Sequence, residues 1–447
     1  MNCMSSGDFF KTWQHSLSSD FQQNGVVAAF GPWITEVNGI SAGEGNITRA
    51  ALSSDNGLIA AAVEHKVHIF DVATSQLLQT LPGHAGAKIQ SIEFHPGGRK
   101  LAVSSQRSEP GFSKKGLLAV HRENLVQIWD LDAPPPSIGH LDEATRAAMA
   151  AASSILSQHW SQDDLKSANL DAEILKVVSA TQATLDVQRG GVFRGTLSSQ
   201  LKARAFSHDG RSLIYCPDRK TVAVIDVDTL TERFRLSGHT DAIMWAETSP
   251  DDKVVATVSW DKTVRIWSMD SGEIVHVLGG ATLQSWAGAF SPDGKLIAAG
   301  DGDKTVRIWR VGTGELLHTL GGFNDWVRTL AFSPDNHHLA AGAGGGTLRV
   351  FDVESGECQQ MWQIAIEGPF GGGFLAVTQV QYSPWGDLFF QSTEGRIFGY
   401  RASHNLKWEV LVPAYGRVGV SADGSRLFAT RGSDVGLWEI NLEGLGK

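Results

Sequence analysis

The sequence is poor in positive charge, and this shortage limits the partners that it can have. Its 447 residues include 38 Lys and Arg against 48 Asp and Glu, a formal net charge of −10. A protein that binds nucleic acid without regard to sequence needs a basic footprint, and anionic membrane surfaces attract basic segments. We therefore expect no nucleic-acid partner and no membrane partner.

Long apolar runs and cysteines are also scarce. No run approaches the roughly 18 apolar residues that indicate a membrane-spanning helix, and the N-terminus MNCMSSGDFFKTWQHSL lacks the basic start and apolar core of a secretory signal. The three cysteines, Cys3, Cys216 and Cys358, are odd in number and widely spaced, which suits a reducing compartment and offers no zinc-site spacing. These features predict a cytoplasmic or nuclear protein without a bound metal or cofactor.

The chain does contain a repeated unit. Residues 238–269 read GHTDAIMWAETSPDDKVVATVSWDKTVRIWSM, and residues 279–311 read GGATLQSWAGAFSPDGKLIAAGDGDKTVRIWRV. The apolar-polar alternation and the many Val, Ile and Thr residues indicate strands, and the Ser-Pro-Asp segments indicate tight turns between them. A self-similar period of about 42 residues is typical of the blades of a β-propeller.

The same register finds eight copies of the unit. The last inner strand recurs as VHIFDV, VQIWDL, VAVIDV, VRIWSM, VRIWRV, LRVFDV, RIFGY and VGLWEI. The final copy lacks an outer strand, and the strand-like residues 26–37 (VVAAFGPWITEV) precede the first copy. We expect residues 26–37 to complete the last blade, because closure removes open sheet edges. The predicted fold is an all-β propeller with eight blades favoured and seven possible; it occupies residues 25–440, between polar tails at 1–24 and 441–447.

The repeats resemble the WD40 family in a specific way. Copy four has the Gly-His, the strand hydroxyl, the turn Asp and the late Trp that form a buried hydrogen-bonded chain in WD40 blades. The resemblance implies that this structural tetrad is His239, Thr257 (or Ser259), Asp261 and Trp267. Copies five and six have Gly279-Gly280 and Gly321-Gly322 in place of Gly-His, so we expect packing and ring closure to supply most of the stability.

Two segments of copy two depart from the repeat. Residues 105–122 are expected to form a long loop, and long loops in compact domains are often functional. Residues 134–188 begin with three prolines and then show helical spacing of apolar residues. We expect a helical insertion there, between the third and fourth strands of the blade. Its apolar stripes either pack on each other and on the propeller or dock a partner helix.

The resemblance implies a protein-interaction scaffold that works as a monomeric propeller within a complex. The positions that face the central channel in WD40 blades correspond here to Met244, Trp260, Gln284, Trp286, Trp326 and Arg328. Tryptophan and arginine are enriched at interface hot spots, so this set is the predicted site for a protein or peptide partner. The competing interpretation is that each Trp packs between neighbouring blades.

Catalysis is not expected. The histidines are scattered, the close pairs His65/His68 and His337/His338 have no third ligand nearby in sequence, and no nucleophile-elbow pattern occurs. The alternative function is a propeller enzyme or a small-ligand binder that uses the central channel. A phosphoinositide binder is a further alternative, although VFRGT has only Arg194 where that group of propellers has paired arginines.

Overall fold

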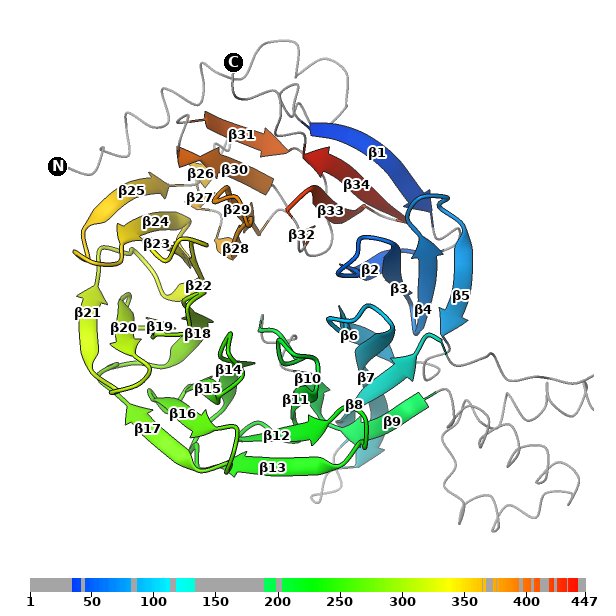
Figure 1. The fold of residues 1–447 in the computed structure, drawn as a ribbon, viewed down its shortest axis with the longest axis horizontal. Helices are drawn as coiled ribbons and strands as arrows, with labels where there is room; N and C mark the ends of the chain where they lie inside the picture. The colour runs from blue at the N-terminus through cyan, green and yellow to red at the C-terminus, as the bar shows by residue number, and fades with distance from the viewer. Residues whose placement is uncertain are drawn as a thin grey trace, which may run out of the picture.

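In the computed structural model of the protein, eight four-stranded antiparallel sheets follow one another around a central axis (Figure 1). The structure describes residues 34–41, 45–81, 87–112, 118–132, 189–197, 203–363, 365–366, 373–374, 376–393, 397–402, 406–410, 418–421, 424–431 and 433–440. Every regular element among these residues is a strand. The predicted all-β propeller with eight blades is confirmed.

The first four blades, in chain order from the innermost strand outward, are built as follows. Blade 1 consists of β2 (Ile47–Leu52), β3 (Leu58–Val63), β4 (Lys66–Asp71) and β5 (Leu77–Leu81). Blade 2 consists of β6 (Lys88–Phe94), β7 (Lys100–Phe112), β8 (Leu118–Asp130) and β9 (Arg189–Arg194). Blade 3 consists of β10 (Thr196–Leu197), β11 (Ser212–Cys216), β12 (Thr221–Asp226) and β13 (Glu232–Ser237). Blade 4 consists of β14 (Ile243–Thr248), β15 (Val254–Ser259), β16 (Val264–Ser268) and β17 (Ile274–Leu278).

The other four blades repeat this order. Blade 5 consists of β18 (Ser285–Phe290), β19 (Leu296–Asp301), β20 (Val306–Arg310) and β21 (Leu316–Leu320). Blade 6 consists of β22 (Val327–Phe332), β23 (His338–Ala343), β24 (Thr347–Asp352) and β25 (Cys358–Gln363). Blade 7 consists of β28 (Val377–Tyr382), β29 (Leu388–Ser392), β30 (Ile397–Arg401) and β31 (Leu406–Val410), and a two-stranded sheet of β26 (Ala365–Ile366) and β27 (Gly373–Phe374) precedes it. Blade 8 consists of β32 (Val418–Val420), β33 (Arg426–Arg431), β34 (Asp434–Ile440) and β1 (Ile34–Ser41).

Strand composition follows position within a blade. The second strands are almost completely buried, and they use small residues where the next blade comes close. A Cβ added at Gly342 on β23 would lie 2.5 Å from Val377 of blade 7, and one at Gly300 on β19 would lie 2.8 Å from Val327 of blade 6. Interiors packed this closely do not accept an extra methyl group without strain. These glycines therefore set the spacing between blades.

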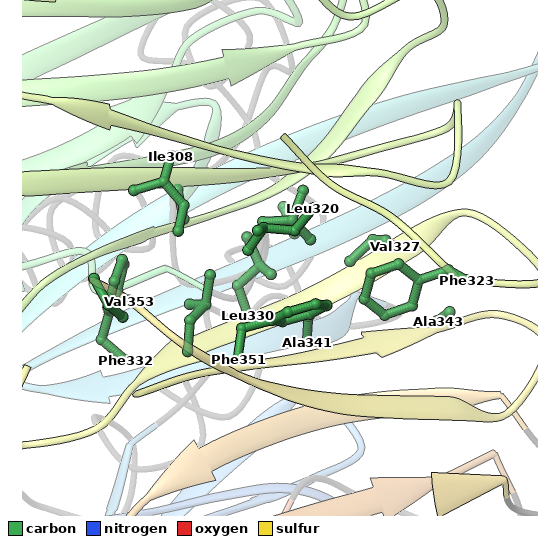
Figure 2. Packing of buried hydrophobic residues seen from close by; sticks show 14 residues of the cluster. Ile308, Leu320, Phe323, Val327, Leu330, Phe332, Ala341, Ala343, Phe351 and Val353 are labelled. Carbon is green, nitrogen blue, oxygen red and sulfur yellow. The ribbon is translucent and has the colours of Figure 1, made fainter. Parts of the chain in front are cut away.

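The core consists of apolar layers between neighbouring blades. In the layer between blades 5 and 6, Ile308 and Leu320 of blade 5 pack against Val327, Phe332 and other residues of blade 6 (Figure 2). Equivalent layers join blade 8 to blade 1, each of blades 1 to 4 to the next blade, and blade 6 to blade 7. Burying apolar surface contributes about 25 cal/mol per Å², so the repeated layers hold the ring together.

The two ends of the chain close the ring within blade 8. Strand β1 pairs antiparallel with β34, from Ile34 opposite Ile440 to Ser41 opposite Asp434. The expected closure by an N-terminal strand is therefore observed. Its expected position was wrong in part, because the pairing strand is Ile34–Ser41 and residues 26–33 lie outside the described part of the chain.

Tight turns at one end of the blades are bonded to each other. Asp252 occupies a turn position at φ 54°, where L residues other than Asn and Asp are uncommon. Its carboxylate accepts backbone N–H bonds from His208 and Asp209 of the preceding blade, at 2.9 and 2.8 Å. The side chain thus compensates for the backbone strain by linking blades 3 and 4.

Of the two segments of blade 2 that depart from the repeat, the structure describes residues only in the first. Residues 105–122 were expected to form an irregular loop, which is wrong: β7 and β8 continue as a ladder to Phe112 opposite Leu118. The antiparallel pairing satisfies the backbone groups that a loop would leave to water. The predicted helical insertion at 134–188 lies outside the described residues. Its expected place is consistent with the strand order, since β8 ends at Asp130 and β9 begins at Arg189.

Candidate interaction face

One end of the propeller collects the predicted site residues. In each blade the innermost strand begins beside the turn that joins the second and third strands, because the sheet is antiparallel. In blade 4, for example, Ile243 at the start of β14 lies opposite Ser259 at the end of β15. We call this end the ladder end, after the aromatic residues described below; the interlinked turns, such as that of Asp252, lie at the opposite end.

Blade 4 contains a continuous buried hydrogen-bonded chain. Trp267 Nε1 donates to Thr257 Oγ1 at 2.9 Å, and Thr257 Oγ1 lies 2.7 Å from His239 Nε2. His239 Nδ1 lies 2.8 Å from Asp261 Oδ2. The structure thus brings together all four tetrad residues and uses Thr257 as the strand hydroxyl. The other candidate, Ser259, donates instead to the carbonyl of Asp241.

The chain of donors fits a neutral histidine. Burial lowers the pKa of His239, and Asp261 only partly offsets this effect. A neutral ring that donates from Nδ1 to Asp261 can accept the Thr257 hydroxyl proton at Nε2, while Thr257 accepts from Trp267. The polar atoms that link the four tetrad side chains are then all paired. The tetrad therefore fixes the turn that contains Asp261 and the loop that contains His239.

Blade 5 has a different buried network in the same place. The position of His239 is occupied by Ala281, one residue after the Gly279-Gly280 pair that was expected to replace Gly-His, and Arg307 on β20 bonds instead to Asp303, the counterpart of Asp261. Its guanidinium contacts Asp301 and lies 3.0 Å from Asp303 Oδ2, with side-chain exposures of 7%, 0% and 10% for the three residues. Ser285 donates a further hydrogen bond to Asp301. Sequence reasoning missed this network, although the acidic pair flanking Gly302 was a visible signal.

The two carboxyls of this network are shifted in opposite directions. Burial raises the pKa of Asp301 to about 6, despite the hydrogen bonds from Ser285 and Arg307. The pKa of Asp303 falls to about 2: burial would raise it, but hydrogen bonds from Arg307, Thr282 and Thr305 outweigh that effect. Asp303 is therefore the firmly ionised partner of Arg307.

The networks fix the loops that enter the innermost strands. In blade 5, Asp303 accepts the backbone N–H of Thr282 at 2.9 Å, and Gly302 donates to the carbonyl of Gln284 at 2.7 Å. In blade 6, Thr347 donates to the Asn324 side chain at 2.7 Å, and that amide donates to the Gly345 carbonyl at 3.0 Å. Blades 5 and 6 thus fix the loop before the innermost strand through different hydrogen bonds.

Three tryptophans of blades 4, 5 and 6 lie at the ends of these fixed loops and turns and form a tryptophan ladder. Trp260 lies in the turn after β15, Trp286 near the start of β18, and Trp326 in the loop before β22. The ring centroids of Trp260 and Trp286 are 4.9 Å apart, with 60° between the planes. Those of Trp286 and Trp326 are 4.3 Å apart and nearly perpendicular, at 89°. Such edge-to-face contacts contribute about 0.5–1.5 kcal/mol per pair. All three residues are half-buried.

A guanidinium stands at each end of the ladder. Arg328 Cζ lies 4.3 Å from the ring centroid of Trp326, and Arg219 Cζ lies 5.6 Å from that of Trp260. Both distances fall within the range of cation–π attraction. Arg219 comes from blade 3 and is exposed, and it was not among the predicted site residues. Its place in the turn between the second and third strands of blade 3, the turn that contains Trp260 in blade 4, was the available signal.

A glycine makes room for one ring of the ladder. A Cβ added at Gly344 would lie 2.6 Å from Trp326 Nε1, whereas one added at Gly302 would make only an ordinary contact with Trp286 Nε1, at 3.4 Å, and would lie closer to the Gln284 carbonyl oxygen, at 3.1 Å. These two glycines occupy the positions in blades 6 and 5 that Trp260 occupies in blade 4. The indole N–H groups of Trp260 and Trp286 are buried and have no hydrogen-bond partner among the described residues, although buried donors are rarely left unpaired.

The two remaining predicted partner residues lie in blades 4 and 5. Gln284 is exposed two residues before Trp286, and Met244 is half-buried on β14. The structure thus brings Trp260, Trp286, Trp326 and Arg328 together through ring and cation–π contacts, to which Gln284 and Met244 do not belong. In the described part of the chain, no group of three or more His, Cys, Asp or Glu is placed to hold a metal ion.

Three other titratable side chains, Glu93, Glu247 and Cys216, have surroundings that fit a structural role. Glu93 on β6 accepts backbone N–H bonds from Ala205 and Phe206 of blade 3, at 3.0 to 3.2 Å. Burial raises the pKa of Glu247 on β14 to about 7 and that of the Cys216 thiol to about 12. A thiol with that pKa stays protonated and is a poor nucleophile.

Within the described segments, no helix has the length and apolar character needed to cross a bilayer.

Comparison with known proteins supports the repeat assignment. The family model "WD domain, G-beta repeat" matches residues 75–108, 230–268, 272–310 and 314–352. The segment 230–268 contains β13 of blade 3 and β14 to β16 of blade 4, and the two segments after it have the same stagger. Each repeat therefore ties two neighbouring blades together covalently.

Several curated proteins are similar to about half of this chain. Apoptotic protease-activating factor 1 of Danio rerio is 24% identical over 51% of the chain and 19% of its own length. Autophagy-related protein 16 of Arabidopsis thaliana is 26% identical, over 55% of the chain and 44% of its own length. Target of rapamycin complex subunit wat1 of Schizosaccharomyces pombe is 25% identical, over 51% of the chain and 66% of its own length. The first two matches thus cover less than half of the relatives' own length. The four matched repeats, together with the eight sheets, identify the chain as a β-propeller with WD40 repeats.

Proposed function

We propose that this propeller is a non-catalytic interaction scaffold that binds a peptide segment of a partner protein on the tryptophan ladder. The observation that carries the proposal is the contact of three half-buried tryptophans from three adjacent blades at one end of the ring. Tryptophan and arginine dominate the energetically important contacts of protein interfaces. The ladder with Arg219 and Arg328 has that composition.

Preorganisation supports a binding role over packing alone. The loops that present Trp286 and Trp326 are fixed by polar networks within their own blades. A surface that is ordered before binding loses little conformational freedom when a partner arrives. Packing between blades would be served by a buried tryptophan such as Trp267, which is 3% exposed, whereas the ladder residues keep part of their surface open.

The names of two relatives describe proteins that act as parts of larger protein complexes. One is named as a subunit of a target of rapamycin complex, and another as a DDB1- and CUL4-associated factor homologue. We extend only the general role to this chain: a propeller that acts within a protein complex in the cytoplasm or nucleus. The partner differs among such proteins because function depends on the site and not on the fold.

The test is the separate replacement of Trp286 and Trp326 by alanine, with capture of partner proteins from the native cell and a thermal melt for each variant. We expect each change to weaken capture by roughly 2 kcal/mol or more, about thirtyfold in affinity. We also expect the melting temperature to change little, since the side chains are half-exposed. Loss of folding stability of about 3–5 kcal/mol would show that the ladder is packing.

Two further tryptophans serve as matched controls. Trp385 is 65% exposed in a turn at the opposite end of blade 7, so Trp385→Ala should leave capture unchanged. Trp267 is buried in the tetrad, so Trp267→Ala should lower stability strongly. If Trp385→Ala abolished capture while Trp286→Ala did not, the binding face would be the opposite end.

A further inference from the structure

The charge at the ladder end differs from that of the whole chain, and this difference points to the chemistry of the partner, given that the proposed function holds. The turns and loops of blades 3 to 6 at this end, together with Arg328 near the start of β22, carry five basic and three acidic side chains outside the buried networks. The basic residues are Arg219, Lys220, Lys262, Lys304 and Arg328, and the acidic ones are Asp218, Asp241 and Asp325. The chain as a whole has a net charge of −10. The ladder therefore lies in a locally basic field.

The acidic side chains at this end are turned toward the backbone. Asp218 accepts the N–H of Lys220, Asp241 accepts that of Ala242, and Asp325 accepts that of Trp326, each at 2.7 to 2.8 Å. A carboxylate that accepts a backbone N–H has part of its charge compensated locally. The basic groups therefore determine the field that a partner meets.

The lysines are less constrained. Lys262 and Lys304 are exposed at equivalent turn positions of adjacent blades, and neither forms an ion pair with a described residue. The acidic residues beside them in sequence, Asp261 and Asp303, are turned inward to His239 and Arg307. Both ammonium groups are thus left to solvent, in the turns of the two blades that carry Trp260 and Trp286.

We propose that the bound segment is acidic, with Asp or Glu side chains on both sides of an apolar residue that rests on the tryptophan ladder. Its carboxylates would meet Lys262, Lys304 and the exposed Arg219. A guanidinium can hold a carboxylate through its edge while its face stays on an aromatic ring. A single-stranded nucleic acid is less favoured, because base stacking needs open aromatic faces and each of the two outer indoles already has a guanidinium over its ring.

The probe is a displayed library of short random peptides, selected on the full chain and on three variants. We expect the enriched peptides to carry acidic residues around an apolar one and to bind more weakly as salt rises. The double variant Lys262→Glu/Lys304→Glu should lower their affinity by about tenfold or more, because opposing charges set both specificity and association rate. Glutamate is tolerated in this turn, since Glu64 has a positive φ of 52° in the same turn of blade 1.

The chain offers a matched control. Lys253 and Lys295 lie in the same two blades at the opposite end, each paired with a nearby carboxylate, Asp251 or Asp293. The variant Lys253→Glu/Lys295→Glu makes the same change of net charge away from the ladder. It should leave peptide affinity within about twofold of the unaltered protein, apart from the screened long-range effect.

The outcomes separate this inference from the proposed function. Enriched peptides that need Trp286 but are neutral or basic, or are insensitive to Lys262→Glu/Lys304→Glu, would overturn the acidic partner and leave the ladder as a peptide site. Absence of any enrichment that depends on Trp286 would overturn both. Ladder-dependent binding of a single-stranded oligouridine probe, without peptide enrichment, would replace the peptide with nucleic acid.

Discussion

Replacing Arg307 by methionine tests the buried network of blade 5. The change keeps most of the side-chain volume and removes the cation that faces Asp301 and Asp303. Asp301 is fully buried, and Arg307 is 7% exposed. Removing one partner of a buried ion pair leaves an uncompensated charge and costs about 3–5 kcal/mol. Since Asp303 is partly open to water, we expect the lower part of this range, about 3 kcal/mol, near pH 8.

The loss should depend on pH with a definite sign. The pKa of Asp301 is raised from 3.8 to about 6 in the folded protein. Between these values the folded state binds more protons than the unfolded state, so this group lowers the free energy of unfolding as pH rises through that window. Without Arg307 the pKa of Asp301 in the folded protein rises further. The pH range over which this group lowers the free energy of unfolding therefore extends to higher pH. The variant should therefore recover stability as the pH falls from about 8 to about 5.

Urea unfolding at several pH values measures both effects. The double variant Asp301→Asn/Arg307→Met should be more stable near pH 8 than Arg307→Met alone, because the fully buried charge of Asp301 is removed and only that of Asp303, at 10% exposure, remains. Arg310→Met is the control: Arg310 pairs with Glu315 on the surface, at exposures of 53% and 62%, and such pairs contribute about 0–1 kcal/mol. An Arg307→Met protein as stable as the unaltered chain, or a loss independent of pH, would refute the account of this network.

Three other changes test different parts of the molecule. Replacing residues 136–188 by a short Gly/Ser linker should preserve a cooperative thermal transition, because β8 and β9 are adjacent antiparallel strands that a short turn can join; a broad, non-cooperative melt would show that the insertion completes the core. Thr257→Val should cost about 1–3 kcal/mol in urea unfolding, since Trp267 loses a buried acceptor; no loss would mean that the tetrad is dispensable. Gly344→Ala should displace Trp326, with which its Cβ would collide, and weaken partner capture more than it lowers the melting temperature; unchanged capture would contradict a role for the ladder geometry.

Much of the fold was predictable because its period is local in the sequence. The turns and strands of each blade recur with the same residue types, so counting them gave the number of blades. The closing strand was placed too early, at residues 26–37, because strand propensity alone does not set register. Its pairing with β34, including the irregularity between Glu36 and Asn38, depends on the last blade of the chain, hundreds of residues away.

The candidate site was predictable only in outline. The tetrad of blade 4 follows a local motif, whereas the network around Arg307 forms because Ala281 leaves space where blade 4 has His239. That space results from the packing of the folded blade and cannot be recognised from the sequence alone. Similarly, the positions of Trp260 and Trp286 could be transferred from the repeat, but their ring contact could not.

The most direct test of the central claim is hydrogen–deuterium exchange on the purified chain with and without its captured partner. The account predicts that binding protects backbone amides in the ladder-end segments around Trp260, Trp286 and Trp326. Turns at the opposite end, such as that of Asp251 and Asp252, should exchange at the same rate in both states. Protection confined to those opposite turns, or to the hairpin of β7 and β8, would contradict the assignment of the ladder end as the binding face.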